Sequence, residues 1–503
     1  MLEMFIAGFG AIFTVKAIIL IAVGVAVGII FGAIPGLTAT MAVALCLPIT
    51  FGMEPVHGMA LLIGLYIGGV SGGLISAILL KIPGTPSSIA TCFDGHPMAA
   101  KGEAGKALGV GIFFSFLGGL FSFFILFFIA PPLAEVALKF GPFEYFAIAI
   151  FSLTMIASLA GNSLAKGLAS GMIGMALALI GTAPIDAYPR FTFGISELDA
   201  GFDLLPALIG LFAISEILNT AENSANIKKD EIRDYSIRGF GFTMAEFKSQ
   251  ILNFIRSSII GTGIGILPGI GGGTSNILAY LAAKNQSKHP EKFGTGIIDG
   301  IVASEAANNA TIGGALVPLL TLGIPGDTVT AMLLGGLMIH GITPGPLLFR
   351  DSGDIVYGIF AALIVANIVM LIMEFFGLRL FVRLLSIPKH ILLPIILALC
   401  VVGAFGLNNR VFDVWTILFF GILGYVLEKF KYPSAPIILG FILGPIAETN
   451  LRRGLMYTNG DFLPFLTKPI AGAFLAIAVF SAVMSVRSNL KNAKKAKESA
   501  AAA

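Results

Sequence analysis

The sequence has 503 residues, of which 56% are hydrophobic and 12% are charged, with a formal net charge of +3 at pH 7. Soluble domains carry about 25% charged residues, so this chain has too little charge to cover a water-exposed surface of its size. Its basic residues are scattered among loops, which argues against a nucleic-acid-binding face. The composition therefore predicts an all-α polytopic membrane protein with roughly 10–14 membrane segments in the lipid bilayer.

Apolar runs long enough to cross a bilayer core of about 30 Å recur along the chain. Examples are 14–34, 56–80, 105–130, 354–378 and 464–486. We expect no removable signal peptide, because Glu3 comes early and no small-residue cleavage site follows a short apolar core. The three cysteines show neither CxxC nor Cys/His spacing, so we expect no disulfide framework and no zinc site.

A long hydrophilic segment divides the chain into two apolar halves. The predicted organisation is an N-terminal membrane repeat over 1–218, a cytoplasmic connecting segment over 219–250, a C-terminal membrane repeat over 251–486 and a cytoplasmic basic tail over 487–503. The connecting segment and the tail are basic, which places both, and hence the C-terminus, on the cytoplasmic side.

Counting spans outward from the connecting segment places most of the 31 lysines and arginines in cytoplasmic loops. The opposite loop, 182–203, is acidic, whereas Arg452 and Arg453 fall on the predicted periplasmic side and are the main exception. The alternation works only if segments 14–50 and 251–283 each enter and leave the membrane on one face. The sequence thus predicts re-entrant segments in both halves.

Two stretches of the first half resemble two stretches of the second half, in the same order. The matched pairs are GAIPGLT at 32–38 with GILPGIG at 265–271, and GGLISAILLKIPG at 72–84 with GALVPLLTLGIPG at 314–326. A duplication explains two such matches better than coincidence. The loop charges give the halves opposite orientations, so we expect two inverted-topology repeats, whose broken segments indicate a transporter's binding site.

Each matched stretch contains a Pro-Gly pair that interrupts an apolar segment. Proline lacks a backbone donor, and freed polar groups cannot face lipid without a cost of several kcal/mol each. Helix N-termini at such breaks offer N–H groups and a positive dipole end to a carboxylate, whereas C-terminal carbonyls suit a cation. A single Pro-Gly pair is as readily a kink or a close-packing point, but four pairs in two matched sets favour a site.

Small polar residues follow the breaks and would hold an anion without adding net charge. The candidate substrate-binding residues are Pro35, Gly36, Thr38, Thr85, Ser87, Ser88, Gly269, Gly271, Gly272, Thr274, Ser275 and Asn276. Polar residues at apparent membrane depth are the candidates for binding Na⁺ or relaying a proton. These ion-coupling candidates are Glu305, Asn308, Asn309, Asp327 and Thr328.

Several polar residues also have a structural interpretation. Glu305 would then lie at the headgroup level, and Asp327 would only cap the helix after its break. We expect Lys81 to extend to the interface rather than attract an anion, and Asp94 and His96 to lie in a cytoplasmic loop. The motifs HExxH and Walker A are absent, so the sequence predicts neither an enzyme nor a metal or cofactor site.

Over nearly its whole length the sequence resembles the large membrane subunit of the tripartite tricarboxylate transporters. The resemblance rests on the motifs at 32–36, 82–86, 94–97, 265–273 and 323–327. It implies ion-gradient-driven secondary uptake of a small tricarboxylate or dicarboxylate across a bacterial inner membrane, without a nucleotide. It also implies a small membrane subunit and a periplasmic solute-binding protein as partners. An anion channel, a stand-alone carboxylate carrier and a membrane-embedded enzyme are the alternatives.

Overall fold

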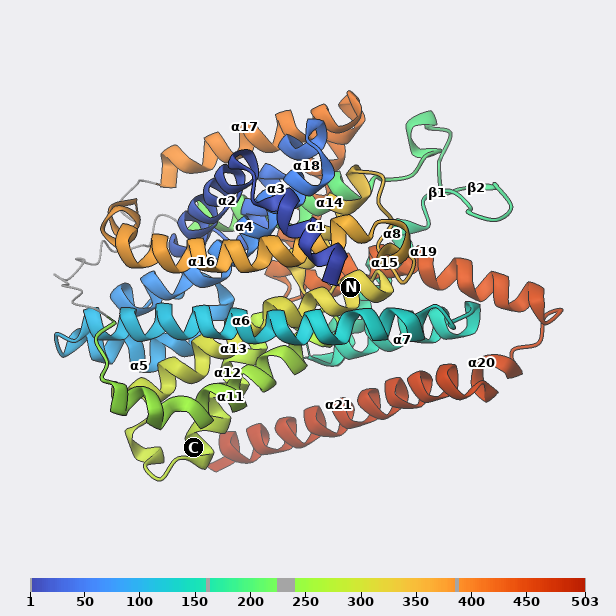
Figure 1. The fold of residues 1–503 in the computed structure, drawn as a ribbon. Coiled ribbons are helices and arrows are strands. Elements are labelled where there is room, and N and C mark those ends of the chain that lie inside the picture. Colours follow the sequence, from blue (N-terminus) through green and yellow to red (C-terminus); the bar gives the residue numbers. More distant parts are fainter. Residues whose placement is uncertain (1, 160–162, 224–239, 385–388, 503) are drawn as a thin grey trace. The chain divides into compact units, whose positions relative to one another are not determined.

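The computed structural model describes residues 2–159, 163–223, 240–384 and 389–502, and it is almost entirely helical (Figure 1). Within this described part, eight helices are long and apolar enough to cross a membrane, and several shorter apolar helices accompany them. The strands β1 (Gly181–Thr182) and β2 (Pro189–Arg190) form one short antiparallel pair, in which Gly181 lies opposite Arg190. The predicted all-α polytopic fold is therefore confirmed.

The chain forms two compact units, each built from two separate stretches. Unit 1 comprises Met1–Glu135 and Glu216–Asn409, and unit 2 comprises Val136–Ser215 and Arg410–Ala503. This division describes packing, whereas the predicted repeats divide the sequence, so the repeat boundaries stay a prediction. Every candidate site residue named above belongs to unit 1.

Unit 1 contains the broken helices and their neighbours. Its elements are α1 (Leu2–Ile12), α2 (Val15–Ala33), α3 (Ala39–Cys46), η1 (Pro48–Gly52), α4 (Pro55–Leu80), η2 (Pro86–Ser88), α5 (Ile89–Ala100), nearly all of α6 (Ala104–Ala137) and of α10 (Ser215–Asn223), α11 (Met244–Ile266), α12 (Gly271–Gln286), η6 (Pro290–Lys292), α13 (Ile298–Leu322), α14 (Thr328–Ile339), α15 (Leu348–Asp351), α16 (Gly353–Leu384) and α17 (Lys389–Asn408).

Unit 2 contains the short hairpin and the remaining helices. Its elements are α7 (Pro142–Leu159), α8 (Leu164–Ala178), β1, β2, η3 (Ser196–Leu198), α9 (Leu204–Ile209), the π-helical turn η4 (Gly210–Ile214), α18 (Val411–Lys429), α19 (Ser434–Tyr457), α20 (Leu463–Thr467) and α21 (Pro469–Ala502). The predicted basic tail, 487–503, continues α21 as helix up to Ala502.

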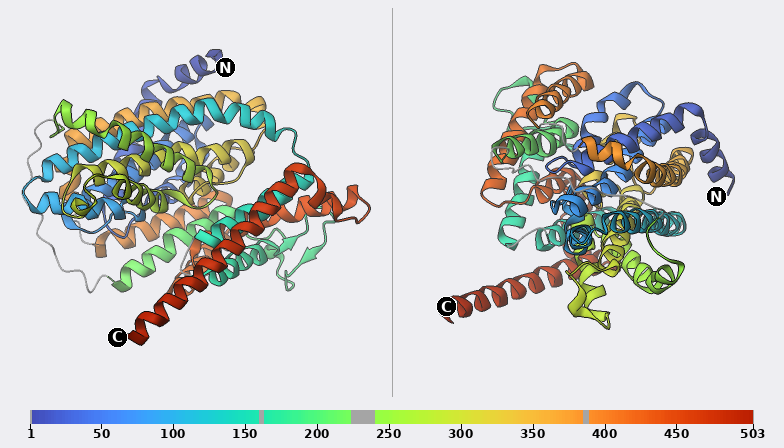
Figure 2. Two further views of the ribbon diagram at one scale, coloured as in Figure 1. Left: turned by 90° about the horizontal axis from the view of Figure 1, so that it is seen from below. Right: turned by 90° about the vertical axis from the view of Figure 1, so that its left-hand side faces the viewer.

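Unit 1 contains two series of helices, one after the other along the chain. The first is α2, α3, α4, α5 and α6, and the second is α11, α12, α13, α14 and α16 (Figures 1 and 2). In each series the first long helix packs against the second, α2 against α4 and α11 against α13. The central helices α4 and α13 are buried along almost their entire length. Such helices need protein on all sides, so they form the core of unit 1.

Glycines allow these paired helices to approach closely. A Cβ atom added to Gly28 or Gly68 would lie 2.5 or 2.3 Å from a carbonyl oxygen of the partner helix, in the α2–α4 pair. In the α11–α13 pair, a Cβ atom on Gly265 or Gly314 would lie 2.6 or 2.4 Å from such an oxygen. Small residues spaced along membrane helices permit this backbone contact, which strengthens van der Waals attraction.

The glycines of the Pro-Gly pairs repeat the same contact in both series. A Cβ atom on Gly84 would lie 2.1 Å from the carbonyl oxygen of Gly32, and one on Gly326 would lie 2.6 Å from that of Gly265. Gly32 and Gly265, like Gly84 and Gly326, are the residues that the sequence comparison aligned. Residues at equivalent positions of the two halves therefore make equivalent contacts.

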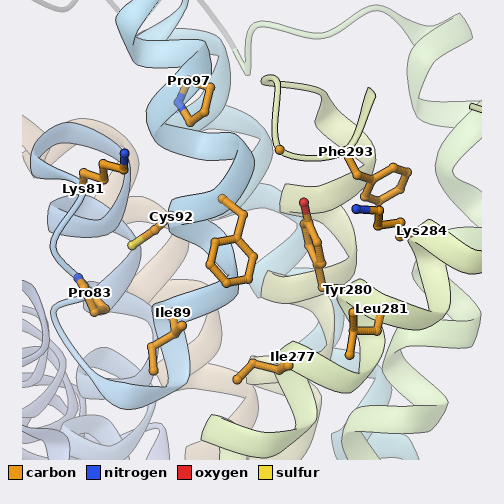
Figure 3. A pocket seen from close by; sticks show the side chains of 12 residues that line it. Lys81, Pro83, Ile89, Cys92, Pro97, Ile277, Tyr280, Leu281, Lys284 and Phe293 are labelled. Atoms are coloured by element: carbon orange, nitrogen blue, oxygen red, sulfur yellow. The ribbon is translucent and has the colours of Figure 1, made fainter. Parts of the chain in front are cut away.

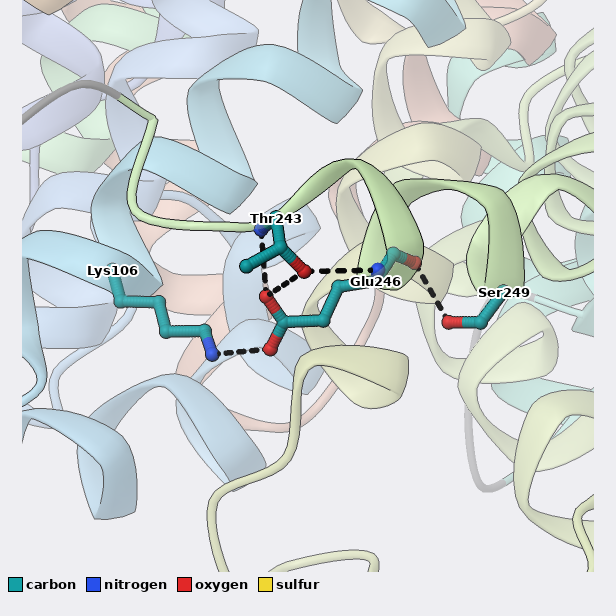
Figure 4. A network of polar contacts seen from close by, with 4 residues as sticks. All are labelled: Lys106, Thr243, Glu246 and Ser249. Atoms are coloured by element: carbon teal, nitrogen blue, oxygen red, sulfur yellow. Dashed lines mark hydrogen bonds and ion pairs between the residues drawn. The ribbon is translucent and has the colours of Figure 1, made fainter.

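The end of the predicted connecting segment is fixed to α6 (Figure 4). Glu246 Oε2 accepts a hydrogen bond from the Thr243 N–H at 2.7 Å, and Glu246 Oε1 pairs with Lys106 Nζ at 2.5 Å. The Thr243 hydroxyl accepts in turn from the Glu246 N–H, which completes a capping box at the start of α11. Residues 224–239 of the connecting segment lie outside the described residues.

In unit 2 one of the two arginines that disturbed the charge tally, Arg452, is paired. Arg452 contacts Asp186 at 3.0 Å and Glu448 at 3.0 Å, and Arg190 pairs with Glu448 at 2.6 Å. Asp186 belongs to the acidic loop 182–203. Arg452 therefore lies on the same side of unit 2 as that loop, with its charge neutralised.

Candidate functional site

Each Pro-Gly pair separates two helices, as the sequence predicted. The pairs follow α2 (Pro35-Gly36), α4 (Pro83-Gly84), α11 (Pro268-Gly269) and α13 (Pro325-Gly326), and α3, η2, α12 and α14 begin within a few residues. Gly36 and Gly269 have φ values of 90° and 74°, a left-handed conformation that glycine adopts without steric cost.

Three of the breaks meet in unit 1. Asn276, in α12 after the third break, donates its side-chain N–H to the carbonyl of Ser87, which follows the second break. A Cβ atom on Gly272 would lie 2.9 Å from Ser87 Cβ. The third and fourth breaks are joined through their backbones, since Gly269 N donates to the Gly326 carbonyl at 2.7 Å.

The first break contacts the fourth break through hydroxyl groups. Thr40 in α3 and Thr328 in α14 form a hydrogen bond of 2.9 Å between their side chains. Thr220 Oγ1 donates to the carbonyl of Gly36 at 3.3 Å. Pro35 and Gly36 remain partly exposed beside this contact. Residues from all four breaks are thus brought together, although they lie in four separate parts of the sequence.

Several candidate hydroxyl groups are occupied by the fold itself. Thr38 Oγ1 caps α3 by accepting from Met41 N at 3.2 Å, and Ser88 Oγ donates to the Thr85 carbonyl at 2.9 Å within a capping box. Ser275 Oγ lies 2.7 Å from Thr311 Oγ1 in the α12–α13 interface. These groups position the broken helices and leave little capacity for a ligand.

The helix α12 differs from its counterparts at its N-terminus. Side chains cap α3 and α14, and a capping box closes η2, but no side chain in the described part of the chain caps α12. The first turn of α12 contains Gly271, Gly272 and the partly exposed Thr274. An uncapped helix N-terminus offers free N–H groups and the positive end of the helix dipole, which attracts an anion.

Amide oxygens without partners lie beside this N-terminus. Among the described residues, the buried side-chain oxygens of Asn276, Asn308 and Asn309 have no hydrogen-bond donor. A Cβ atom on Gly272 would lie 2.7 Å from Asn308 Oδ1, so this oxygen faces the first turn of α12. The nitrogens of Asn276 and Asn308 donate to the carbonyls of Ser87 and Val70, which fixes both orientations. The free oxygens therefore suit a cation or a hydroxyl donor.

Asp327 has two sets of contacts. It caps α14, since Asp327 Oδ1 accepts from Thr330 N at 2.7 Å, and this cap was part of the structural interpretation. Its other oxygen, Oδ2, accepts from the Tyr66 hydroxyl on α4 at 2.5 Å. A Cβ atom on Gly271 would also lie 3.1 Å from Asp327 Cβ, which places this carboxylate beside the start of α12. The carboxylate that caps α14 therefore also borders the N-terminus of α12.

Glu305 is fully buried in α13. Thr91 and Ser115 donate hydrogen bonds to its two oxygens, the latter at 2.9 Å. No ion pair among the described residues involves Glu305 or Asp327. A buried carboxylate without a cation is stable when it is protonated or binds a cation from solution.

Sequence reasoning missed Glu374 and Tyr66. Glu374 in α16 is fully buried, accepts from Ser71 Oγ at 2.9 Å, and has a second oxygen without a partner in the described structure. The sequence does mark Glu374 as a candidate, because it interrupts a long apolar run, and acidic residues inside such runs are functional candidates. Tyr66 carried no comparable signal, because its role depends on the distant Asp327.

The structure corrects the expectation for Asp94. Asp94 and His96, which the sequence assigned to a loop, lie in the helix α5, which continues to Ala100, and Asp94 is fully buried. Asp94 Oδ1 accepts from the N–H groups of Gly294 and Gly296 at 2.9 and 2.8 Å, and Oδ2 accepts from the Tyr280 hydroxyl at 2.9 Å. Asp94 therefore connects α5 to α12 and to the segment between α12 and α13.

These features define a multi-pass α-helical membrane protein in which broken helices meet at a buried polar centre. The family model of the tripartite tricarboxylate transporter TctA family matches residues 18–439, and the chain belongs to this family of transporter components.

Two proteins of Agrobacterium vitis are similar to the chain. An uncharacterized 52.8 kDa protein of the TAR-I ttuC' 3' region is 37% identical over 485 residues, which is 96% of each chain. An uncharacterized protein of the TAR-II ttuC' 3' region is 37% identical over 232 residues, which is 46% of this chain and 96% of that protein. No solved structure matches the chain.

Proposed function

We propose that this chain is the transport subunit of a binding-protein-dependent tripartite system that takes up a small carboxylate by ion-gradient-driven secondary transport. In this proposal a small membrane subunit and a periplasmic solute-binding protein are its partners, and the system lies in a bacterial inner membrane with the C-terminus in the cytoplasm. The substrate is a tricarboxylate or a dicarboxylate. The family supports a transporter component, and the geometry of unit 1 supports a buried site for a carboxylate and a cation.

The observation that carries the proposal is the uncapped N-terminus of α12 beside unpartnered amide oxygens. A carboxylate group would bind the N–H groups of Gly272 and its neighbours, with Ser87 and Thr85 on the facing break. The orientation of the Asn276 side chain changes its predicted role. Its free oxygen would accept from a substrate hydroxyl or bind the coupling cation, whereas it would repel a carboxylate.

Ion coupling follows from the charge of the bound substrate. A carboxylate bound at α12 makes the binding of a cation or a proton at the nearby acids and amides more favourable. By linkage, the bound cation or proton favours carboxylate binding to the same extent. Asp327 borders the start of α12, and Asn308 faces it. We propose that Asn308, Asn309 and Asp327 bind Na⁺ or relay a proton, with Glu305, Thr328 and the buried Glu374 completing the network. Na⁺ or H⁺ is then the only cofactor, and no enzymatic step is involved.

Accumulation against a gradient tests the proposal. The chain, reconstituted in proteoliposomes with its two partner proteins, should concentrate labelled citrate or a dicarboxylate when an inward Na⁺ or proton gradient is imposed. A channel would only equilibrate the substrate, and a stand-alone carrier would work without the added partners. Equilibration without accumulation under both gradients would overturn the transport mechanism proposed here.

A glycine substitution tests the site. Gly272→Ala places a methyl group 2.7 Å from Asn308 Oδ1 and 2.9 Å from Ser87 Cβ, in the first turn of α12 whose N–H groups are proposed to bind the carboxylate, so uptake should be lost while the amount of protein in the membrane stays normal. Gly263→Ala in α11 is the matched control, because its Cβ atom would meet nothing within 4 Å. Normal uptake by Gly272→Ala would show that the substrate binds elsewhere.

A further inference from the structure

A cavity of about 660 Å³ lies in unit 1 between the end of α4, α5, α12 and the segment that follows α12 (Figure 3). The aromatic rings of Phe93, Tyr280 and Phe293 line it, and the Phe93 and Tyr280 rings make an edge-to-face contact at 5.2 Å between centroids. The proposed uptake site does not account for this cavity.

Two lysines contribute its charge. Lys81, at the end of α4, and Lys284, in the last turn of α12, lie on opposite sides of the cavity in Figure 3. Neither amine forms an ion pair or a hydrogen bond with the described residues. The left-handed backbone of Lys81 (φ 59°) ends α4 beside the cavity and the residue is exposed, so its extension to the interface stays a prediction.

The adjacent carboxylate of Asp94 forms no ion pair with either lysine. Asp94 is fully buried, and its oxygens already accept from the N–H groups of Gly294 and Gly296 and from the Tyr280 hydroxyl. Among the described residues that line the cavity, the two lysines are the only charged ones. An aromatic cavity with two unpaired cations attracts an anion that carries more than one negative charge.

The cavity adjoins the proposed uptake site. Pro83, which precedes the Thr85–Ser88 turn, lines it, as does Ile277, the residue after Asn276. Ile277, Tyr280, Leu281 and Lys284 occupy one face of α12, so the cavity extends about 10 Å along this helix from the turn that bears Asn276. Lys101 and Lys106 follow α5, and Lys284, Lys288 and Lys292 lie around the end of α12. These basic residues predict that the cavity opens to the cytoplasm.

We propose that this cavity is a second anion site, a cytoplasmic vestibule in which Lys81 and Lys284 hold a di- or tricarboxylate as it leaves the break region. The inference rests on the proposed uptake function and adds the exit side to it. Two cations on opposite walls select acids with two or more carboxylates over monocarboxylates.

A charge-selective labelling experiment tests the vestibule. Leu281, which lines the cavity and is 45% exposed, is replaced by cysteine in a variant without Cys46, Cys92 and Cys400, in phosphatidylcholine vesicles. The rate of modification by an anionic methanethiosulfonate is divided by the rate with a cationic one. This ratio should fall about tenfold in Lys81→Gln/Lys284→Gln, equivalent to about 1.4 kcal/mol, and return in Lys81→Arg/Lys284→Arg. The exposed Lys288→Gln is the matched control and should leave it unchanged.

Protection identifies the ligand. Citrate should slow modification of Leu281→Cys, acetate at equal ionic strength should not, and the double glutamine variant should lose the protection. An unchanged ratio, or absent citrate protection, would overturn the vestibule. Protection by phosphatidylglycerol in the vesicles instead of citrate would do the same and assign the cavity to a lipid headgroup.

The two proposals fail in different ways. The labelling needs no gradient and no partner protein, so citrate protection can be found even if accumulation is absent, which would refute only the transport proposal. Gradient-driven accumulation with an unchanged labelling ratio would refute only the vestibule.

Discussion

Replacing Gly84 by alanine tests whether the second break depends on direct backbone contact. The added Cβ atom would lie 2.1 Å from the Gly32 carbonyl oxygen and 2.7 Å from Ser76 Oγ. Ordinary carbon contacts begin above about 3 Å, so α2 and the break must separate by about 1 Å. Gly84 does not adopt the left-handed conformation that favours glycine, so the substitution tests the collision alone.

The expected cost follows from overpacking, which typically destabilises by about 1–3 kcal/mol. Gly111→Ala in α6 is the control, because its Cβ atom would meet side chains at 3.6 Å or more, an ordinary contact. Alanine is favoured over glycine by up to about 1 kcal/mol in a helix, so the control should be neutral or slightly stabilised.

Thermal unfolding of the purified variants in detergent, monitored by a thiol-reactive dye, measures the difference. Gly84→Ala should melt below the wild type and take up little substrate, and Gly326→Ala should behave alike because its Cβ atom would lie 2.6 Å from the Gly265 carbonyl oxygen. If Gly84→Ala and Gly111→Ala unfold at the same temperature, the backbone contact does not determine the stability of the break.

Three further predictions concern charged groups. Asp327→Asn should abolish gradient-driven accumulation but leave the protein in the membrane, whereas the exposed Asp354→Asn should accumulate normally; normal accumulation by the first variant would remove its coupling role. Glu374→Gln keeps the shape of a protonated carboxyl, so it should fold normally and lose the dependence of uptake on the coupling ion; retained dependence would assign Glu374 to packing. The hydrogen bond from Lys106 lowers the pKa of Glu246, with help from the Thr243 N–H. This stabilisation is present above the unfolded pKa of about 4.3 and is lost as pH falls through the lower folded value, so the stability difference between wild type and Glu246→Gln should shrink on acidification. The pair is partly exposed, so the difference at pH 7 should stay below about 1 kcal/mol, and a difference independent of pH would contradict the assignment (Figure 4).

The sequence by itself determined the features that depend on neighbouring residues. Long apolar runs predicted the spans, because the bilayer sets their length and the chain must satisfy its own backbone there. Pro-Gly pairs predicted where helices stop, because proline removes a donor at a defined residue. Asp327 was recognised for the same reason, since its charge stands beside such a break.

The tertiary structure alone decided which distant residues meet. Tyr66 and Asp327 are 261 positions apart, and Asn276 and Ser87 are 189 apart, so their contacts follow from packing that no local pattern encodes. The same packing buried Asp94, which the sequence assigned to a loop, and opened a cavity beside Lys81. Local composition fixes where a helix ends, whereas the free groups around that end depend on which helices pack beside it.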